Sequence, residues 1–161
     1  MNSFSNRIVN WYKKNGRHDL PWRKNISPYS IWISEIMLQQ TQVKTVIPYF
    51  NKFIEKYPNL EALIQASEDE ILAQWSGLGF YRRAKNIYKA CRVISEDFNN
   101  KLPTNLNDLE SLPGIGRSTA GAIMSIAFNE GYPILDANVK RVLGRYKKIS
   151  FKTENEKQKK L

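Results

Sequence analysis

Apolar residues recur along most of the chain at intervals of three and four positions, the spacing of an amphipathic helix. One stripe combines Val43, Val46, Ile47, Phe50, Phe53 and Ile54, and another combines Ala84, Ile87, Cys91 and Ile94. No segment shows a convincing alternation of apolar and polar residues, which would predict a β-strand. The hydrophobic pattern therefore predicts an all-α protein.

Residues that commonly cap helices mark several predicted helix starts. Ser5 is a candidate cap for a first helix that ends at Gly16, and Ser27 precedes Pro28, a residue suited to a first helical turn. Thr41 is a candidate cap for the helix that carries the stripe from Val43 to Ile54. The remaining candidate starts are Asn59, the Ser67–Glu70 capping box, Pro103–Thr104 and Asp136.

Length and composition describe a globular protein with a basic surface. The 161 residues suffice for one domain or for two small lobes, and 42% hydrophobic with 25% charged residues favours a folded over a disordered chain. Lysine and arginine number 25 against 15 acidic residues, which gives a formal net charge of +10. That charge favours a polyanionic partner such as a nucleic acid, although a lysine-rich proteome would produce the same balance.

Several other classes of protein are disfavoured. No run of about 18 apolar residues predicts a transmembrane helix, so no membrane partner is expected, and the N-terminus lacks a secretory signal pattern. The single cysteine, Cys91, excludes an intramolecular disulfide and an all-cysteine metal site within this sequence. Together these features favour the cytoplasm.

A glycine-rich turn, Leu112-Pro113-Gly114-Ile115-Gly116, separates a short predicted helix from a second helix rich in small residues. This order is typical of a helix–hairpin–helix, in which backbone amides hold a DNA phosphate and a monovalent cation can bridge backbone carbonyls. A lone Gly-x-Gly is also compatible with a plain tight connection. The basic surroundings make DNA binding the better interpretation.

Two carboxylates are candidates for chemistry. Glu35 lies among apolar residues, a setting that favours a protonated carboxyl, but the helix could equally place it on a polar face with Gln39 and Gln42. Asp136 has an ordinary role available as a helix cap, and it can fulfil that role while turning one oxygen toward a site.

Polar and aromatic residues near two predicted turns are candidates for contacts with bases. Adjacent Gln39 and Gln40 carry amides suited to base edges, although solvated glutamines are equally ordinary. The turn over 77–81 either reverses the chain or forms a wedge that pries bases apart. Its candidate wedge residues are Leu78, Phe80 and Tyr81, followed by a basic helix with Arg82, Arg83, Lys85 and Lys89 expected outside.

On these motifs the chain resembles the MutY-type adenine DNA glycosylases within the endonuclease III superfamily. The matching segments are residues 20–23, 32–43, 77–84, 112–121 and 134–143, within a resemblance that extends from Trp11 to about Arg145. It implies a helix–hairpin–helix DNA glycosylase fold with a six-helix barrel module over 23–134. Residues 1–22 and 135–161 would form parts of an incomplete second helical lobe.

The resemblance also implies roles for individual residues. Glu35 would be the general acid that protonates a flipped adenine, Asp136 would stabilise the sugar cation, and Asn138 would support the site. Trp22 and Arg23 would lie near the adenine pocket, and Gln39, Gln40, Leu78 and Phe80 near the lesion and the vacated base stack. Further expected DNA-contacting residues are Tyr81, Arg82, Leu112, Gly114, Gly116, Ser118 and Thr119.

The implied function is hydrolysis of the N-glycosidic bond of adenine mispaired with 8-oxoguanine or guanine in duplex DNA, during base excision repair. The enzyme would act as a monomer in a bacterial-type cytoplasm, associated with the nucleoid through DNA. Bifunctional relatives carry a lysine where this chain has Ser118, so the resemblance implies a monofunctional glycosylase. The alternatives are a thymine or oxidised-pyrimidine glycosylase of the same superfamily and a DNA-binding module without activity.

The chain departs from the family pattern at two points. Phe80 stands where the family usually has tyrosine, which keeps an aromatic ring but removes a hydroxyl. The family's four-cysteine loop, which holds a [4Fe–4S] cluster, would lie beyond Leu161, and so would its C-terminal recognition domain. The resemblance therefore predicts a fragment or a truncated form whose cluster ligands are absent from this sequence.

Overall fold

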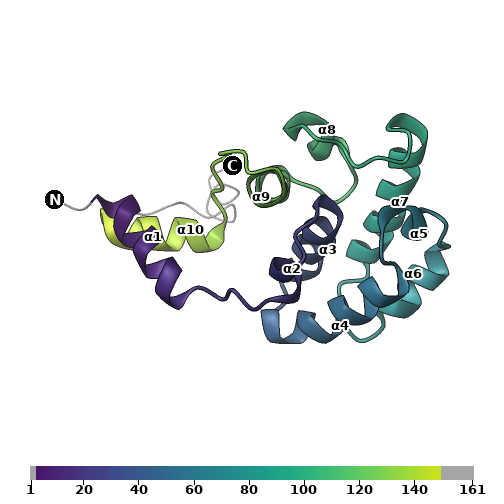
Figure 1. Ribbon diagram of the computed structural model, residues 1–161, viewed down its shortest axis with the longest axis horizontal. Coiled ribbons are helices and arrows are strands. Elements are labelled where there is room, and N and C mark those ends of the chain that lie inside the picture. Colours follow the sequence, from purple (N-terminus) through teal and green to yellow (C-terminus); the bar gives the residue numbers. More distant parts are fainter. Residues whose placement is uncertain (1–2, 150–161) are drawn as a thin grey trace, which may run out of the picture.

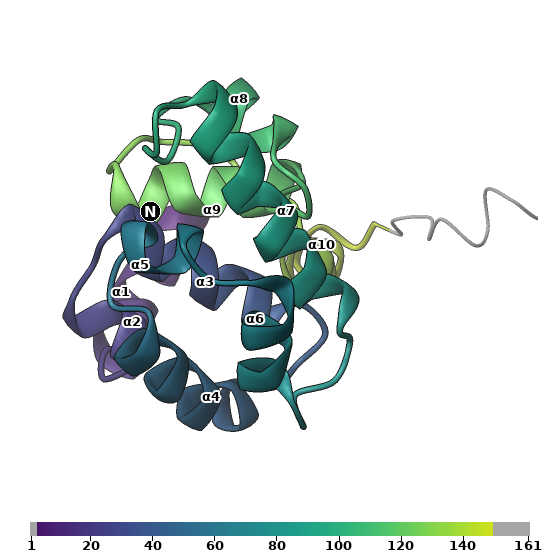
Figure 2. The same ribbon diagram turned by 90° about the vertical axis from the view of Figure 1, so that its right-hand side faces the viewer.

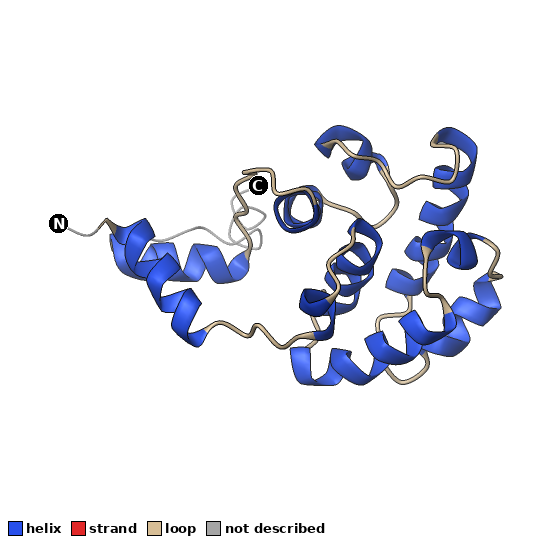
Figure 3. Ribbon diagram, in the orientation of Figure 1, coloured by secondary structure: helices blue, strands red, loops and turns tan. Residues whose placement is uncertain are grey.

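The computed structural model describes residues 3–149 as helices joined by loops, with no strand among these residues (Figure 3). The all-α prediction is thereby confirmed. In chain order the helices are α1 (Phe4–Asn15), α2 (Pro21–Lys24), α3 (Pro28–Leu38), α4 (Val43–Lys56), α5 (Leu60–Ile64), α6 (Glu68–Trp75), α7 (Arg82–Asp97), α8 (Leu106–Ser111), α9 (Arg117–Ala127) and α10 (Ala137–Lys147).

Helix α3 lies at the centre of the main body, which comprises α2 to α9 (Figures 1 and 2). It packs against α2, α4 and α9. Most of its 11 residues are buried, including Ile31, Trp32 and Ile33, because its sequence is apolar on nearly every face. Helices α5, α6 and α7 complete the core around large buried side chains such as Phe53 and Trp75.

Local capping explains where several helices begin. The Ser27 hydroxyl accepts a hydrogen bond from the Ser30 amide at 3.0 Å, and Pro28 occupies the first turn of α3. Asn59 caps α5, Ser67 and Glu70 form the capping box of α6, and Asp136 caps α10. These four starts confirm the sequence prediction.

Three starts differ from the predictions. Ser3, and not Ser5, caps α1. Gln42 precedes α4 without a side-chain cap, because the Thr41 hydroxyl donates to the Gln39 carbonyl at 3.3 Å instead. Asn105 caps α8, one residue beyond Thr104. In each case a neighbouring polar residue with the right local geometry takes the capping position.

Helices α1 and α10 lie side by side at one end of the molecule, apart from the main body (Figure 1). The rings of Phe4 and Tyr146 stack with centroids 3.9 Å apart, yet neither helix contains a buried residue. Large apolar side chains are correspondingly exposed on both: Ile8, Val9, Trp11, Tyr12, Val142 and Tyr146. The predicted portion of this lobe from 150 to 161 lies outside the described residues.

The chain enters the main body at helix α2. Trp22, on α2, is 3% exposed and packs edge-on against Phe50 with ring centroids 5.2 Å apart. Helix α2 contacts both α3 and α4. The connection between the two regions is therefore the segment over 16–20. No helix among residues 3–149 is long and apolar enough to cross a membrane.

Candidate active site

Glu35 lies half-buried on α3, the most deeply packed helix of the main body. Burial raises the pKa of its carboxyl above the ordinary value. The positive charge of Arg23 lowers that pKa, and the negative charge of Asp136 raises it further. The structure thus brings Arg23 and Asp136 each within electrostatic reach of Glu35, although the three residues come from α2, the start of α10 and α3.

The path of the chain after α9 explains how Asp136 reaches α3. Helix α9 packs along α3, and the loop over 128–136 then turns back across α9. A Cβ atom at Gly121 would lie 3.4 Å from Ile134 and 3.8 Å from the Cβ of Tyr132. The Ser125 hydroxyl donates to the Tyr132 carbonyl at 3.2 Å and fixes the loop there. The small residue at 121 therefore lets the loop run close to α9.

Both carboxylate oxygens of Asp136 have partners. One oxygen accepts from the Val139 amide at 2.7 Å, which is the cap of α10. The other accepts from the Asn138 side-chain amide at 3.5 Å. The Asn138 carbonyl in turn accepts from Arg141. Asn138 therefore contacts Asp136, and its role as a supporting residue stays a prediction.

The predicted hairpin is present as α8, the turn over 112–116 and α9. Gly114 has φ +84°, and a Cβ there would lie 2.8 Å from the Cβ of Asn86, so this position requires glycine. Gly116 is the N-cap of α9 and provides no side-chain cap. The first amides of α9, at residues 117–119, are consequently left for an anion.

Some of the other predicted hairpin residues are buried, and one is exposed to solvent. Leu112 is 2% exposed and Thr119 9% exposed, so both support the turn from inside. Ser118 is exposed in the first turn of α9. The Gln39 side-chain amide donates to the Gly114 carbonyl at 3.3 Å and to the Thr119 hydroxyl at 3.5 Å. Gln39 thereby ties the end of α3 to the hairpin, a contact that the sequence did not reveal.

The turn over 77–81 differs from the predicted wedge of three side chains. Leu78 is only 5% exposed and packs in the core, whereas Phe80 and Tyr81 are 57% and 45% exposed. Phe80 adopts a left-handed backbone conformation with φ +51°. The two aromatic residues are therefore the outward-facing part of this turn.

The basic helix also differs from the sequence expectation at one position. Arg82, Lys85 and Lys89 are exposed on α7, but Arg83 is buried and hydrogen-bonded to backbone carbonyls. Its spacing to Ile87 and Cys91 continues the buried stripe of that helix, and this periodicity was the available signal. The expectation that Arg83 faces solvent was wrong, because its position on the buried stripe outweighs its charge.

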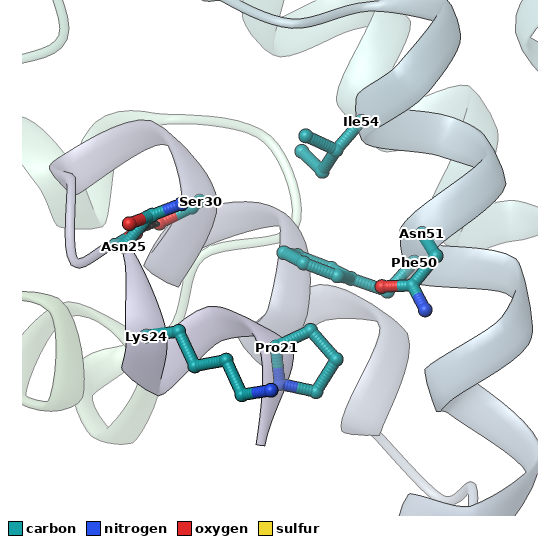
Figure 4. A pocket seen from close by; sticks show the side chains of 7 residues that line it. All are labelled: Pro21, Lys24, Asn25, Ser30, Phe50, Asn51 and Ile54. Carbon is teal, nitrogen blue, oxygen red and sulfur yellow. Dashed lines mark hydrogen bonds between the residues drawn. The ribbon is translucent and has the colours of Figure 1, made fainter. Parts of the chain in front are cut away.

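A cavity of about 370 Å³ opens on the main body between α2, the start of α3 and α4 (Figure 4). Its lining consists of Pro21, Lys24, Asn25, Ser30, Phe50, Asn51 and Ile54. None of the residues predicted to act in catalysis, Glu35, Asp136 and Asn138, lines this cavity.

Metal-binding side chains are not grouped in the part of the chain that the structure describes. No set of three or more His, Cys, Asp or Glu side chains could hold a metal ion there. Cys91 is a free cysteine and is buried within α7. These residues do not fit a [4Fe–4S] cluster, which requires several cysteine thiolates.

Comparison with known proteins identifies the class. Residues 33–161 match the model of the HhH-GPD superfamily of base excision DNA repair proteins. The chain belongs to this superfamily.

Relatives that cover most of this chain carry one name. A protein named adenine DNA glycosylase from Buchnera aphidicola subsp. Schizaphis graminum is 58% identical over 143 residues, covering 89% of this chain and 41% of its own length. Another with that name from Rattus norvegicus is 42% identical over 156 residues, covering 91% and 30%. The chain thus spans less than half the length of these curated relatives.

Among solved structures, a thermostable thymine-DNA glycosylase superposes with a TM-score of 0.81 at 32% identity. The alignment covers 88% of this chain and 65% of that protein. It confirms the predicted helix–hairpin–helix glycosylase fold.

Proposed function

We propose that this chain is the catalytic portion of a monofunctional DNA glycosylase that removes adenine mispaired with guanine or 8-oxoguanine. The observation that carries the proposal is the half-buried Glu35 carboxyl, whose raised pKa favours an acid, placed within electrostatic reach of Asp136. The shared name of the relatives supports adenine as the base.

The two carboxylates have complementary tasks in this reaction. Adenine leaves poorly as an anion, so Glu35, whose pKa is raised by burial, donates a proton to the flipped base. The deoxyribose then develops positive charge, which the Asp136 carboxylate stabilises. Hydrogen bonds from Val139 and Asn138 hold Asp136 in place for that task. As the bond between adenine and C1′ of the sugar breaks, water adds to C1′, and the proton that this water releases returns to the Glu35 carboxylate.

DNA contacts in the proposal come from the surfaces that face outward near this site. The amides at the start of α9 hold a phosphate, and any monovalent cation at the turn is held by backbone carbonyls, because acidic side chains are not grouped there. Gln40, Phe80 and Tyr81 approach the base stack. Arg82 meets the phosphate backbone. Duplex DNA in a bacterial cytoplasm is the proposed setting.

The proposed domain division follows the two regions of the fold. The main body with α2 to α9 carries the acid and the hairpin, and the lobe with α1 and α10 carries Asp136 at its edge. A [4Fe–4S] cluster has no part in the proposed chemistry of residues 3–149.

Base release from defined duplexes tests the proposal. Under single-turnover conditions, we expect adenine release from A:8-oxoguanine and A:G duplexes but no thymine release from a T:G duplex. Because Ser118 cannot form an imine with the sugar, the strand should break only after alkali or heat.

Other results would replace the proposal. Thymine release would favour the activity in the name of the structural neighbour. Strand scission at the rate of base release, without alkali, would refute the monofunctional reaction. Mispair binding without release would leave a recognition module.

A further inference from the structure

Arg83 makes an unusual set of contacts for a charged residue: its guanidinium is bonded to backbone carbonyls from two separate turns. One nitrogen, Nη1, donates to the carbonyls of Ile36, Met37 and Gln39 at 3.2, 2.6 and 2.6 Å. The other, Nη2, donates to the Gly79 carbonyl at 3.1 Å. One side chain therefore joins the end of α3 to the turn over 77–81.

Burial and aromatic packing hold the guanidinium in place. Arg83 is 6% exposed, and its guanidinium carbon lies 5.4 Å from the Trp75 ring centroid and 5.3 Å from that of Phe80. The two ion pairs found among residues 3–149 involve Lys85 and Arg117. The charge of Arg83 is thus balanced by carbonyl dipoles, including those at the C-terminal end of α3.

Two of the four carbonyls that accept from Arg83, those of Gln39 and Gly79, occupy equivalent positions in their turns. Gln39 immediately precedes Gln40, which has φ +57°, and Gly79 immediately precedes Phe80, which has φ +51°. Residues other than glycine seldom adopt this left-handed conformation unless their surroundings impose it. Both Gln40 and Phe80 are exposed, and both belong to the proposed contact surface for DNA.

We propose that Arg83 is a positioning residue that fixes Gln40 and Phe80 at one spacing, so that mispair recognition requires both turns together. The proposal rests on the proposed function, because mispaired DNA is the ligand that the two turns would read. Gln39 extends the same unit to the hairpin through its hydrogen bond to Gly114.

The substitution Arg83→Lys distinguishes the positioning role of Arg83 from the effect of its positive charge. Lysine keeps the positive charge, but its single ammonium lacks the planar fork that bonds two turns at once. Arg82→Met is the matched control for lost charge, because Arg82 is adjacent and exposed. Leu63→Ala is the control for lost stability, because Leu63 is fully buried in α5, outside both turns.

Amide hydrogen exchange of the free protein is the first test. Arg83→Lys should accelerate exchange over 39–42 and over 77–82 together, by at least about tenfold relative to Leu63→Ala, since local opening exposes only the released segments. Acceleration at one turn alone, or at neither, would overturn the proposal. This result does not depend on any activity.

Binding is the second test, with Glu35→Gln as the background so that no base is removed. Arg83→Lys should reduce the preference for an A:8-oxoguanine duplex over an A:T duplex by at least about tenfold and leave the salt dependence unchanged. Arg82→Met should instead lower the slope of log K against log salt by about 0.9 if it meets one phosphate.

The outcomes distinguish the two proposals. A protein with Arg83 intact that shows no mispair preference would contradict the proposed function, and the exchange result alone would then decide the role of Arg83. A clear preference that survives Arg83→Lys would overturn the positioning role and leave the proposed function standing.

Discussion

The two carboxylates of the candidate site are carried by regions with very different packing. Glu35 belongs to α3. The residues before and after it in the sequence, Ser34 and Ile36, are almost completely buried. Asp136 begins α10, which contains no buried residue and stacks on α1 through Phe4 and Tyr146. One group therefore stands on a tightly packed core and the other on a lightly packed lobe.

This difference in packing indicates which parts of the molecule set the distance between the Glu35 and Asp136 carboxylates. The core fixes Glu35, but Asp136 is placed by short-range features: the loop against Gly121, its cap on Val139 and its contact with Asn138. The proposed hydrolysis uses both carboxylates at once, so in that mechanism the lobe and its connecting loop set the catalytic geometry as much as the core does.

Removing the acid should have the largest effect. Glu35→Gln keeps the shape of the side chain but cannot donate a carboxyl proton, so single-turnover adenine release should fall by at least about 10²-fold. Mispair binding should persist. Glu96→Gln, an exposed change on α7, is the matched control. An undiminished rate in Glu35→Gln would remove Glu35 from the mechanism.

The contrast in packing between the main body and the lobe predicts a second, smaller effect, on the free energy of unfolding. Leu63→Ala opens a cavity in the core of the main body and should lower the free energy of unfolding by about 2–5 kcal/mol. Val142→Ala in α10 should change it by less than about 0.5 kcal/mol, because Val142 is 46% exposed. Denaturant titration of both variants measures the difference. Equal losses would mean that the lobe is packed as tightly as the core.

The smallest effect concerns the pKa of Glu35. Asp136 raises this pKa and Arg23 lowers it, so Asp136→Asn should move it down and Arg23→Gln should move it up. Asparagine remains a good helix cap, so α10 should keep its start. Carboxyl NMR titration of Glu35 reads the shift directly. Shifts of the same sign in both variants would contradict the proposed arrangement of the three charges.

Much of the fold was predictable because helix starts and buried stripes depend on nearby residues. Ser27 with Pro28, the Ser67–Glu70 box and Asp136 all cap helices as predicted, through contacts within three residues. The glycine at 114 also marked its turn correctly, since its positive φ is a local requirement. The roles of Glu35 and Asp136 in catalysis stay predictions for the experiments above.

What the sequence by itself determined is therefore local: the all-α class, the hairpin and most helix starts follow from short-range hydrogen bonds and apolar spacing. Only the tertiary structure decided which partners the buried Arg83 finds, because four carbonyls from two turns must converge before a guanidinium can leave water. It also decided that Leu78 packs inward and that Asp136 returns to Glu35. Those outcomes depend on contacts between segments far apart in the chain, which no local pattern encodes.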